Sequence, residues 1–77
     1  MKYEDIFCKT VELLSTITKV EEITPESELM GDLDIGSMAL LSLLCSLEAE
    51  FDIHLPERTI RKVVTVEDLV DTIQGMI

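Results

Sequence analysis

The sequence predicts an all-α protein, a four-helix bundle of three main helices and one short helix, with a long first loop. Two observations predict this fold class. Apolar residues recur at three- and four-residue steps in three segments, and no segment shows the alternating pattern of a half-buried β-strand. The 77 residues are enough for one domain, residues 1–77, near the lower size limit for an apolar core without disulfides or metals.

The first predicted helix covers residues 2–17. Its polar residues fall between the members of an apolar stripe made of Tyr3, Ile6, Phe7, Thr10, Val11, Leu14 and Ile17. This spacing is typical of an amphipathic helix. Residues 18–36 then break the periodicity, and we expect a long connection held on the core by Val20, Ile23, Leu29, Leu33 and Ile35.

The second predicted helix runs from Ser37 to about Phe51. Its inward stripe consists of Leu40, Leu43, Leu44, Leu47 and Phe51. Further apolar residues widen this surface: Met38, Ala39, Leu41 and Cys45. They indicate either burial on several sides or an exposed contact patch, and burial is the ordinary interpretation.

The last third of the chain predicts one short and one longer helix. Pro56 opens a short turn or helix over residues 57–60. Thr65 is the expected N-cap of the last helix, with Asp68 at the third helical position and Gly75 near the end. The inward stripe of this helix is Val66, Leu69, Val70 and Ile73.

The charge of the chain limits its class of partner. Sixteen acidic and six basic residues give a net charge of -10, which disfavours nucleic acid and anionic membranes and favours proteins with basic patches. No segment approaches a membrane-spanning length, the first residues lack a leader pattern, and Cys8 and Cys45 fit no CxxC spacing. We therefore expect a cytoplasmic monomer that does not insert into membranes.

The segment with the most distinctive chemistry is Asp32–Met38, where the long connection meets the second helix. It places Ser37 at the start of that helix, where free backbone N–H groups and the helix dipole favour a phosphodiester. Gly36 leaves the approach to the hydroxyl open. The alternative interpretation is that Ser37 is an ordinary N-cap.

From about residue 2 to residue 76 the chain resembles the acyl carrier protein family. The resemblance rests on the order of the predicted helices and on four motifs at matching spacings: Gly36-Ser37-Met38, Glu48-Ala49-Glu50-Phe51, Asp52-Ile53-His54-Leu55-Pro56 and Thr65-Val66-Glu67-Asp68-Leu69. It implies a bundle of acyl-carrier type whose Ser37 receives 4'-phosphopantetheine from coenzyme A. The chain would be a carrier of acyl or aminoacyl thioesters and not an enzyme.

The resemblance also implies a set of site residues and partners. Beside Ser37, the cofactor-binding residues would be Gly36, Asp34 and Met38, and the partner-binding residues would be Met38, Ala39, Leu41, Glu48 and Asp32. The partners would be a phosphopantetheinyl transferase and acyl-loading and acyl-transfer enzymes with basic or apolar docking patches. Fatty acid and polyketide biosynthesis are expected settings, but the sequence does not reveal whether the pathway makes one of these, a peptide or a modified cell-envelope polymer.

The sequence departs from the family pattern at two places. The family usually has Asp immediately before the serine, where this chain has Gly36, and acids shortly after it, where this chain has Ala39 and Ser42. We take this to indicate a specialised member that docks through apolar contacts. Gly36 also leaves open a second function: an unmodified interaction module with the carrier fold.

Other candidate sites in the sequence are weaker. Asp32-x-Asp34-x-Gly36 resembles the start of a calcium loop but lacks its later Gly and Glu, and Gly36-Ser37 lacks the second glycine of a hydrolase elbow. His54 stands alone, and a solvent-facing or loop-tethering role is expected. Arg58, Arg61 and Lys62 are expected to pair with surface acids. No catalytic residues and no metal site are predicted.

Overall fold

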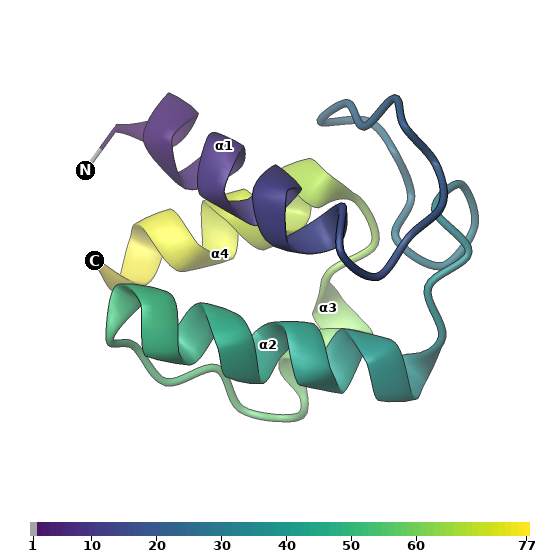
Figure 1. The fold of residues 1–77 in the computed structure, drawn as a ribbon. Helices are drawn as coiled ribbons and strands as arrows, with labels where there is room; N and C mark the ends of the chain where they lie inside the picture. The colour runs from purple at the N-terminus through teal and green to yellow at the C-terminus, as the bar shows by residue number, and fades with distance from the viewer. Residues whose placement is uncertain (1) are drawn as a thin grey trace.

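The computed structural model describes residues 2–77 and contains four helices: α1 (Tyr3–Leu14), α2 (Ser37–Phe51), α3 (Thr59–Lys62) and α4 (Val66–Met76). α1 packs on α4 and on α2, and the short α3 packs on α2 (Figure 1). The long loop joins the end of α1 to the start of α2 at one end of the bundle, and the two termini lie at the other. The predicted all-α fold, with three main helices, a short third helix and a long first loop, is confirmed.

α1 is shorter than the sequence predicts, because the chain tightens after Leu14. Ile17 N–H donates to Leu14 O at 3.0 Å, a three-residue step that turns the chain out of the helix. Ile17 is consequently exposed and is not part of the buried stripe, which consists of Ile6, Thr10 and Leu14. The buried Thr10 hydroxyl donates to Ile6 O at 2.8 Å, so no unpaired polar group is left in the core there.

The loop between α1 and α2 is held on the core by side chains and by backbone hydrogen bonds. Leu29, Leu33 and Ile35 are buried as predicted, whereas Val20 is exposed and does not anchor the loop. Leu29 N–H donates to Val64 O at 2.9 Å, and Val66 N–H donates to Ser27 O at 3.0 Å. These bonds tie the loop to the start of α4 and fix where the chain enters α2.

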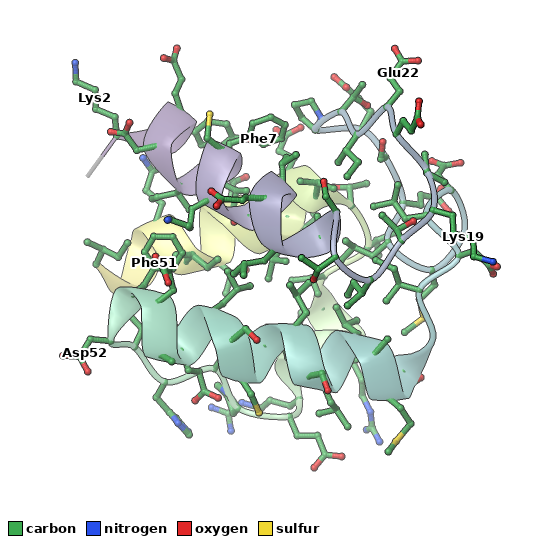
Figure 2. The ribbon with its side chains drawn as sticks, in the orientation of Figure 1. Lys2, Phe7, Lys19, Glu22, Phe51 and Asp52 are labelled. Atoms are coloured by element: carbon green, nitrogen blue, oxygen red, sulfur yellow. The ribbon has the colours of Figure 1, made fainter. Side chains whose placement is uncertain are left out.

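α2 is apolar over most of its circumference, and its core residues are Leu40, Leu43, Leu44 and Leu47. Phe51 is only partly buried, and Figure 2 shows it projecting from the end of α2 toward α4. The helix ends at Phe51, and the left-handed backbone of the cap residue Asp52 (φ 53°) lets the N–H of Ile53 return to Glu48 O at 3.2 Å. The burial expected for the additional apolar residues is wrong for Met38 and Cys45, which are exposed, while Ala39 and Leu41 are partly buried.

α4 begins and packs as the sequence predicts. Thr65 Oγ1 accepts from Asp68 N–H at 3.1 Å, and the Asp68 carboxylate accepts from Thr65 N–H at 3.1 Å, which makes a capping box. Its four stripe residues, Val66, Leu69, Val70 and Ile73, are fully buried. The helix continues one residue beyond Gly75, to Met76.

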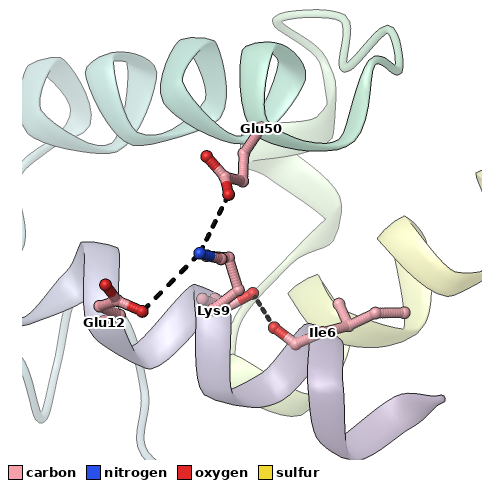
Figure 3. Close-up of polar contacts among 5 residues, drawn as sticks. Ile6, Lys9, Glu12 and Glu50 are labelled. Atoms are coloured by element: carbon pink, nitrogen blue, oxygen red, sulfur yellow. Dashed lines mark hydrogen bonds and ion pairs between the residues drawn. The ribbon is translucent and has the colours of Figure 1, made fainter. Parts of the chain in front are cut away.

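One ion pair joins two helices on the side of the bundle away from the long loop. Lys9 Nζ of α1 lies 3.1 Å from Glu50 Oε1 of α2 and 3.9 Å from Glu12 Oε2 (Figure 3). The hydrogen bond to Glu50 and the charges of both carboxylates raise the pKa of Lys9 above its usual value. The contact is exposed, so it orients α1 on α2 more than it stabilises the fold.

Candidate functional site

Ser37 is the first residue of α2, and Gly36 is its N-cap. The first helical hydrogen bond runs from Leu40 N–H to Gly36 O at 2.9 Å, so the N–H groups of Ser37, Met38 and Ala39 have no acceptor within the helix. Because Gly36 occupies the cap position, the alternative interpretation of Ser37 as the N-cap is wrong. The Ser37 side chain is exposed and makes no hydrogen bond to any part of residues 2–77.

A surface pocket of about 490 Å³ opens beside Ser37, between α2 and the segment that forms α3. Ser37 and Leu41 line it from α2, and four residues line it from the other side: Glu57, Arg58, Ile60 and Arg61. The pocket therefore combines an apolar wall, two guanidinium groups and one carboxylate. An exposed hydroxyl beside free helix N–H groups suits a phosphodiester, and the pocket beyond it suits an elongated, partly apolar group.

The other predicted cofactor residues lie around Ser37 but do not line this pocket. Met38 is 79% exposed and Asp34 is exposed, with a left-handed backbone (φ 53°). Asp34 instead lines a different hollow, together with residues 17–20 and Leu33. Gly36 has no heavy atom within 4 Å of the place where a Cβ would stand, so the approach to Ser37 past Gly36 is open.

Two of the predicted partner-binding acids are used inside the chain. Asp32 Oδ2 accepts from Glu28 N–H at 2.8 Å and closes a turn of the long loop. Glu48 Oε2 accepts from Leu55 N–H at 3.0 Å and lies 3.2 Å from His54 Nδ1. His54, in the turn after α2, thereby contacts the helix while its side chain stays largely exposed, as expected.

The four pocket residues after Pro56 were not predicted as site residues from the sequence. The expected pairing of Arg58, Arg61 and Lys62 with surface acids is wrong: within residues 2–77 none of the three has a carboxylate within 4.0 Å. A signal was available in the spacing, because residues three apart in a helical turn share a face, and Arg58 and Arg61 are three apart. What the sequence could not tell was which element that face would meet.

The segment that carries Ser37 lies within a match to a known protein family. Residues 8–73 match the family model described as "Phosphopantetheine attachment site". The chain belongs to the phosphopantetheine-binding acyl carrier protein family. It is 30% identical to the acyl carrier protein of Micrococcus luteus over 74 residues, 94% of this chain and 91% of that protein. It is equally similar to the acyl carrier protein of Myxococcus xanthus, over 94% of both chains.

Membership of the family fixes the coarse biochemistry of this carrier. It holds 4'-phosphopantetheine covalently on a serine, and it is a non-catalytic carrier whose partners are a phosphopantetheinyl transferase and acyl-handling enzymes. Within residues 2–77, no helix has both the length and the apolar character needed to span a bilayer.

Proposed function

We propose that Ser37 is the serine that carries the prosthetic group. The observation that supports this best is an exposed hydroxyl at the first position of α2, without a hydrogen bond and open to the pocket. The other serines inside the family match are less suited. Ser27 is buried and Ser15 donates to Val11 O at 2.9 Å, while Ser42 and Ser46 lie within α2, where the backbone N–H groups are already bonded.

The chain supplies the place of attachment, and the prosthetic group supplies a terminal thiol that holds the cargo as a thioester. Ser37 Oγ provides the ester oxygen, and the N-terminal N–H groups and dipole of α2 favour the negative charge next to it. A nucleophilic serine would need an adjacent base, and attachment by a separate transferase does not. No basic or histidine side chain is within three residues of Ser37 in the sequence.

We propose that this carrier serves a specialised acyl or aminoacyl pathway and docks to its enzymes through apolar contact at the start of α2. Met38, Ala39 and Leu41 offer that contact, and Met38 is the most exposed large apolar side chain of residues 2–77. α2 has no acid in its first turn. Asp32 and Glu48 retain exposed or partly exposed carboxylates that a basic partner could reach, although both also serve turns of the chain.

The attachment is tested by intact mass after coexpression with a phosphopantetheinyl transferase. The wild type should gain the mass of one phosphopantetheinyl group, Ser37→Ala should gain nothing, and the matched control Ser42→Ala should behave as the wild type. Modification of Ser37→Ala, or loss of modification in Ser42→Ala, would move the site elsewhere in the chain.

The sequence left open an unmodified interaction module, because the family usually has Asp where this chain has Gly36, and the family match favours the modified carrier over it. The result expected for such a module in the same experiment is an unmodified wild type with every transferase tried. The specialised role has its own test, in which the modified protein is incubated with fatty-acid synthase enzymes of general metabolism. Efficient loading and elongation there would contradict it.

We propose a reducing compartment, the cytoplasm, as the place of action. Cys8 and Cys45 are both free and exposed, and exposed thiols stay unpaired most readily where thiols are kept reduced. Alkylation of both cysteines in freshly lysed cells without added reductant checks this placement.

A further inference from the structure

The feature that the carrier function does not account for is the basic edge of the pocket beside Ser37. Three of the six basic residues of the chain lie within five positions, at 58, 61 and 62, in a protein with a net charge of -10. We propose that Arg58 and Arg61 form an anion-binding site for the phosphodiester that joins the prosthetic group to Ser37, and so hold the base of the arm against α3. This inference rests on the proposed modification of Ser37.

The backbone that carries the two arginines is well fixed. Arg61 N–H donates to Arg58 O at 3.1 Å, so both residues belong to one helical turn and share a face. Thr59, between them, is buried, and Val63 N–H donates to Thr59 O at 3.1 Å. The bond from Leu29 N–H to Val64 O then ties the end of this segment to the long loop. Both guanidinium groups therefore start from a rigid support at the edge of the pocket that Ser37 lines.

The charges in the pocket favour an anion. Arg58 and Arg61 contribute two positive charges and Glu57 one negative charge, which leaves one positive charge on the lining. Neither arginine has a carboxylate within 4.0 Å in residues 2–77, whereas Lys9 is paired with two. A guanidinium group presents a planar set of N–H donors that matches phosphate oxygens. The phosphodiester is the anion that attachment to Ser37 necessarily brings to this pocket.

The rest of the lining suits the part of the arm beyond the phosphodiester. Leu41 and Ile60 form the apolar part of the pocket, on opposite sides of it. A chain of methyl, methylene and amide groups can lie between them while its charged end stays at the arginines. Glu57 is the one negatively charged residue in the lining, and it repels the phosphodiester. Its removal should therefore have the opposite effect to the removal of an arginine.

The test uses protein that carries the prosthetic group, and a measurement of intact mass first confirms that each variant carries one such group. The variants are Arg58→Gln, Arg61→Gln, their combination and Glu57→Gln. Lys62→Gln is the matched control, because it removes the same charge from the same short segment at a residue outside the pocket. The phosphorus-31 relaxation rate and chemical shift report how far the phosphodiester is immobilised, and amide spectra report that the fold is intact.

The double variant should lower the ratio of held to free phosphodiester about two- to fivefold, the size expected for charge pairs at an exposed site. Glu57→Gln should raise that ratio, and Lys62→Gln should leave it unchanged. Equal phosphorus signals in the wild type and the double variant, or an equal effect of Lys62→Gln, would overturn the proposal. If the arginine variants unfold, the proposal is tested by Glu57→Gln alone, and an unchanged ratio of held to free phosphodiester in that variant would overturn it. If the wild type carries no prosthetic group, the proposed modification of Ser37 is contradicted, which is a different result from the failure of the anion-binding site.

Discussion

Gly36 is the residue at which the chain departs most clearly from its family, and its geometry does not require glycine. Its φ of -75° and ψ of 168° are open to every residue, and there is free space where a Cβ would stand. Asp is also a better N-cap than Gly. The departure is therefore not imposed by the fold, which agrees with a role in recognition by the transferase.

We expect Gly36→Asp to increase kcat/KM for modification by a standard phosphopantetheinyl transferase about tenfold, the effect of one added charged hydrogen bond of roughly 1.4 kcal/mol. The thermal melt should stay equal or rise slightly because the cap improves. Gly36→Asn is the control, since it caps the helix without the charge. An equal gain in kcat/KM for Gly36→Asn would show that the carboxylate is not what the transferase recognises.

Asp68 is the residue with the clearest pH-dependent contribution to stability. The backbone N–H groups of Thr65 and Val64, each 3.1 Å from its Oδ2, hold the pKa of its carboxyl below the usual value of 3.8. A pKa that is lower in the folded chain stabilises the fold above the unfolded value, and the effect disappears as the pH falls through the folded pKa.

Asp68→Asn should therefore lower the free energy of unfolding by about 1 kcal/mol at pH 7, and the difference from the wild type should shrink as the pH falls below the usual carboxyl pKa and vanish below the folded pKa. Urea unfolding at a series of pH values measures both. Asp71→Asn is the control on the same helix, because Asp71 is exposed. In a chain of net charge -10 its loss should be neutral or slightly stabilising. A constant difference for Asp68→Asn at every pH would mean that its charge is not involved.

At the scale of elements, α2 and α4 follow the apolar periodicity of the sequence closely, because the stripes that predict them are the ones the bundle buries. The sequence was less informative where hydrogen bonds, and not apolar periodicity, decide where a helix begins or ends. α1 ends at Leu14 because the chain tightens there, and α3 forms two residues later than predicted, after turns that begin at Pro56.

The two sides of the pocket could not be predicted equally well from the sequence. Ser37 and Leu41 were predictable because they belong to one helix with a clear start. Arg58 and Arg61 come from a four-residue helix and its N-cap some twenty positions later, too short for a periodic pattern to reveal which face it turns to α2. The pairing of the two elements is a tertiary feature that no local pattern records.

The structure separates two residues of α2 that the sequence treats alike. Leu47 is fully buried against the core, whereas Phe51 is partly buried at the end of the helix. Leu47→Ala should cost about 2 to 5 kcal/mol of unfolding free energy, a large part of the stability of a small bundle. Phe51→Ala should cost less, because part of its ring is already in contact with water. Urea denaturation measures both, and a larger loss for Phe51→Ala would contradict the register of α2.

At the scale of the whole molecule, the acids of α2 and the proposed attachment site lie at opposite ends of the helix. Figure 1 shows the start of α2, where Ser37 lies, at the end of the bundle opposite the termini. The two acids of α2 are at its other end, where Glu48 binds the following turn and Glu50 pairs with Lys9. In the docking that we propose, a partner would be attracted by the field of the entire chain and would then meet Met38, an uncharged and exposed side chain next to Ser37.

This division predicts that the two phases of docking respond to different changes. The association rate constant with a transferase should fall by about an order of magnitude between roughly 0.01 M and 0.15 M salt, because salt screens the long-range attraction of the -10 charge. Met38→Ser should instead raise the dissociation rate constant roughly tenfold at any salt concentration, since it removes apolar surface buried on contact. Stopped-flow binding measures both constants.

Met76→Ser is the control, because Met76 is also exposed but lies at the end of α4 near the C-terminus. If Met76→Ser matched Met38→Ser, or if Met38→Ser acted only at low salt, the start of α2 would not be an apolar docking surface.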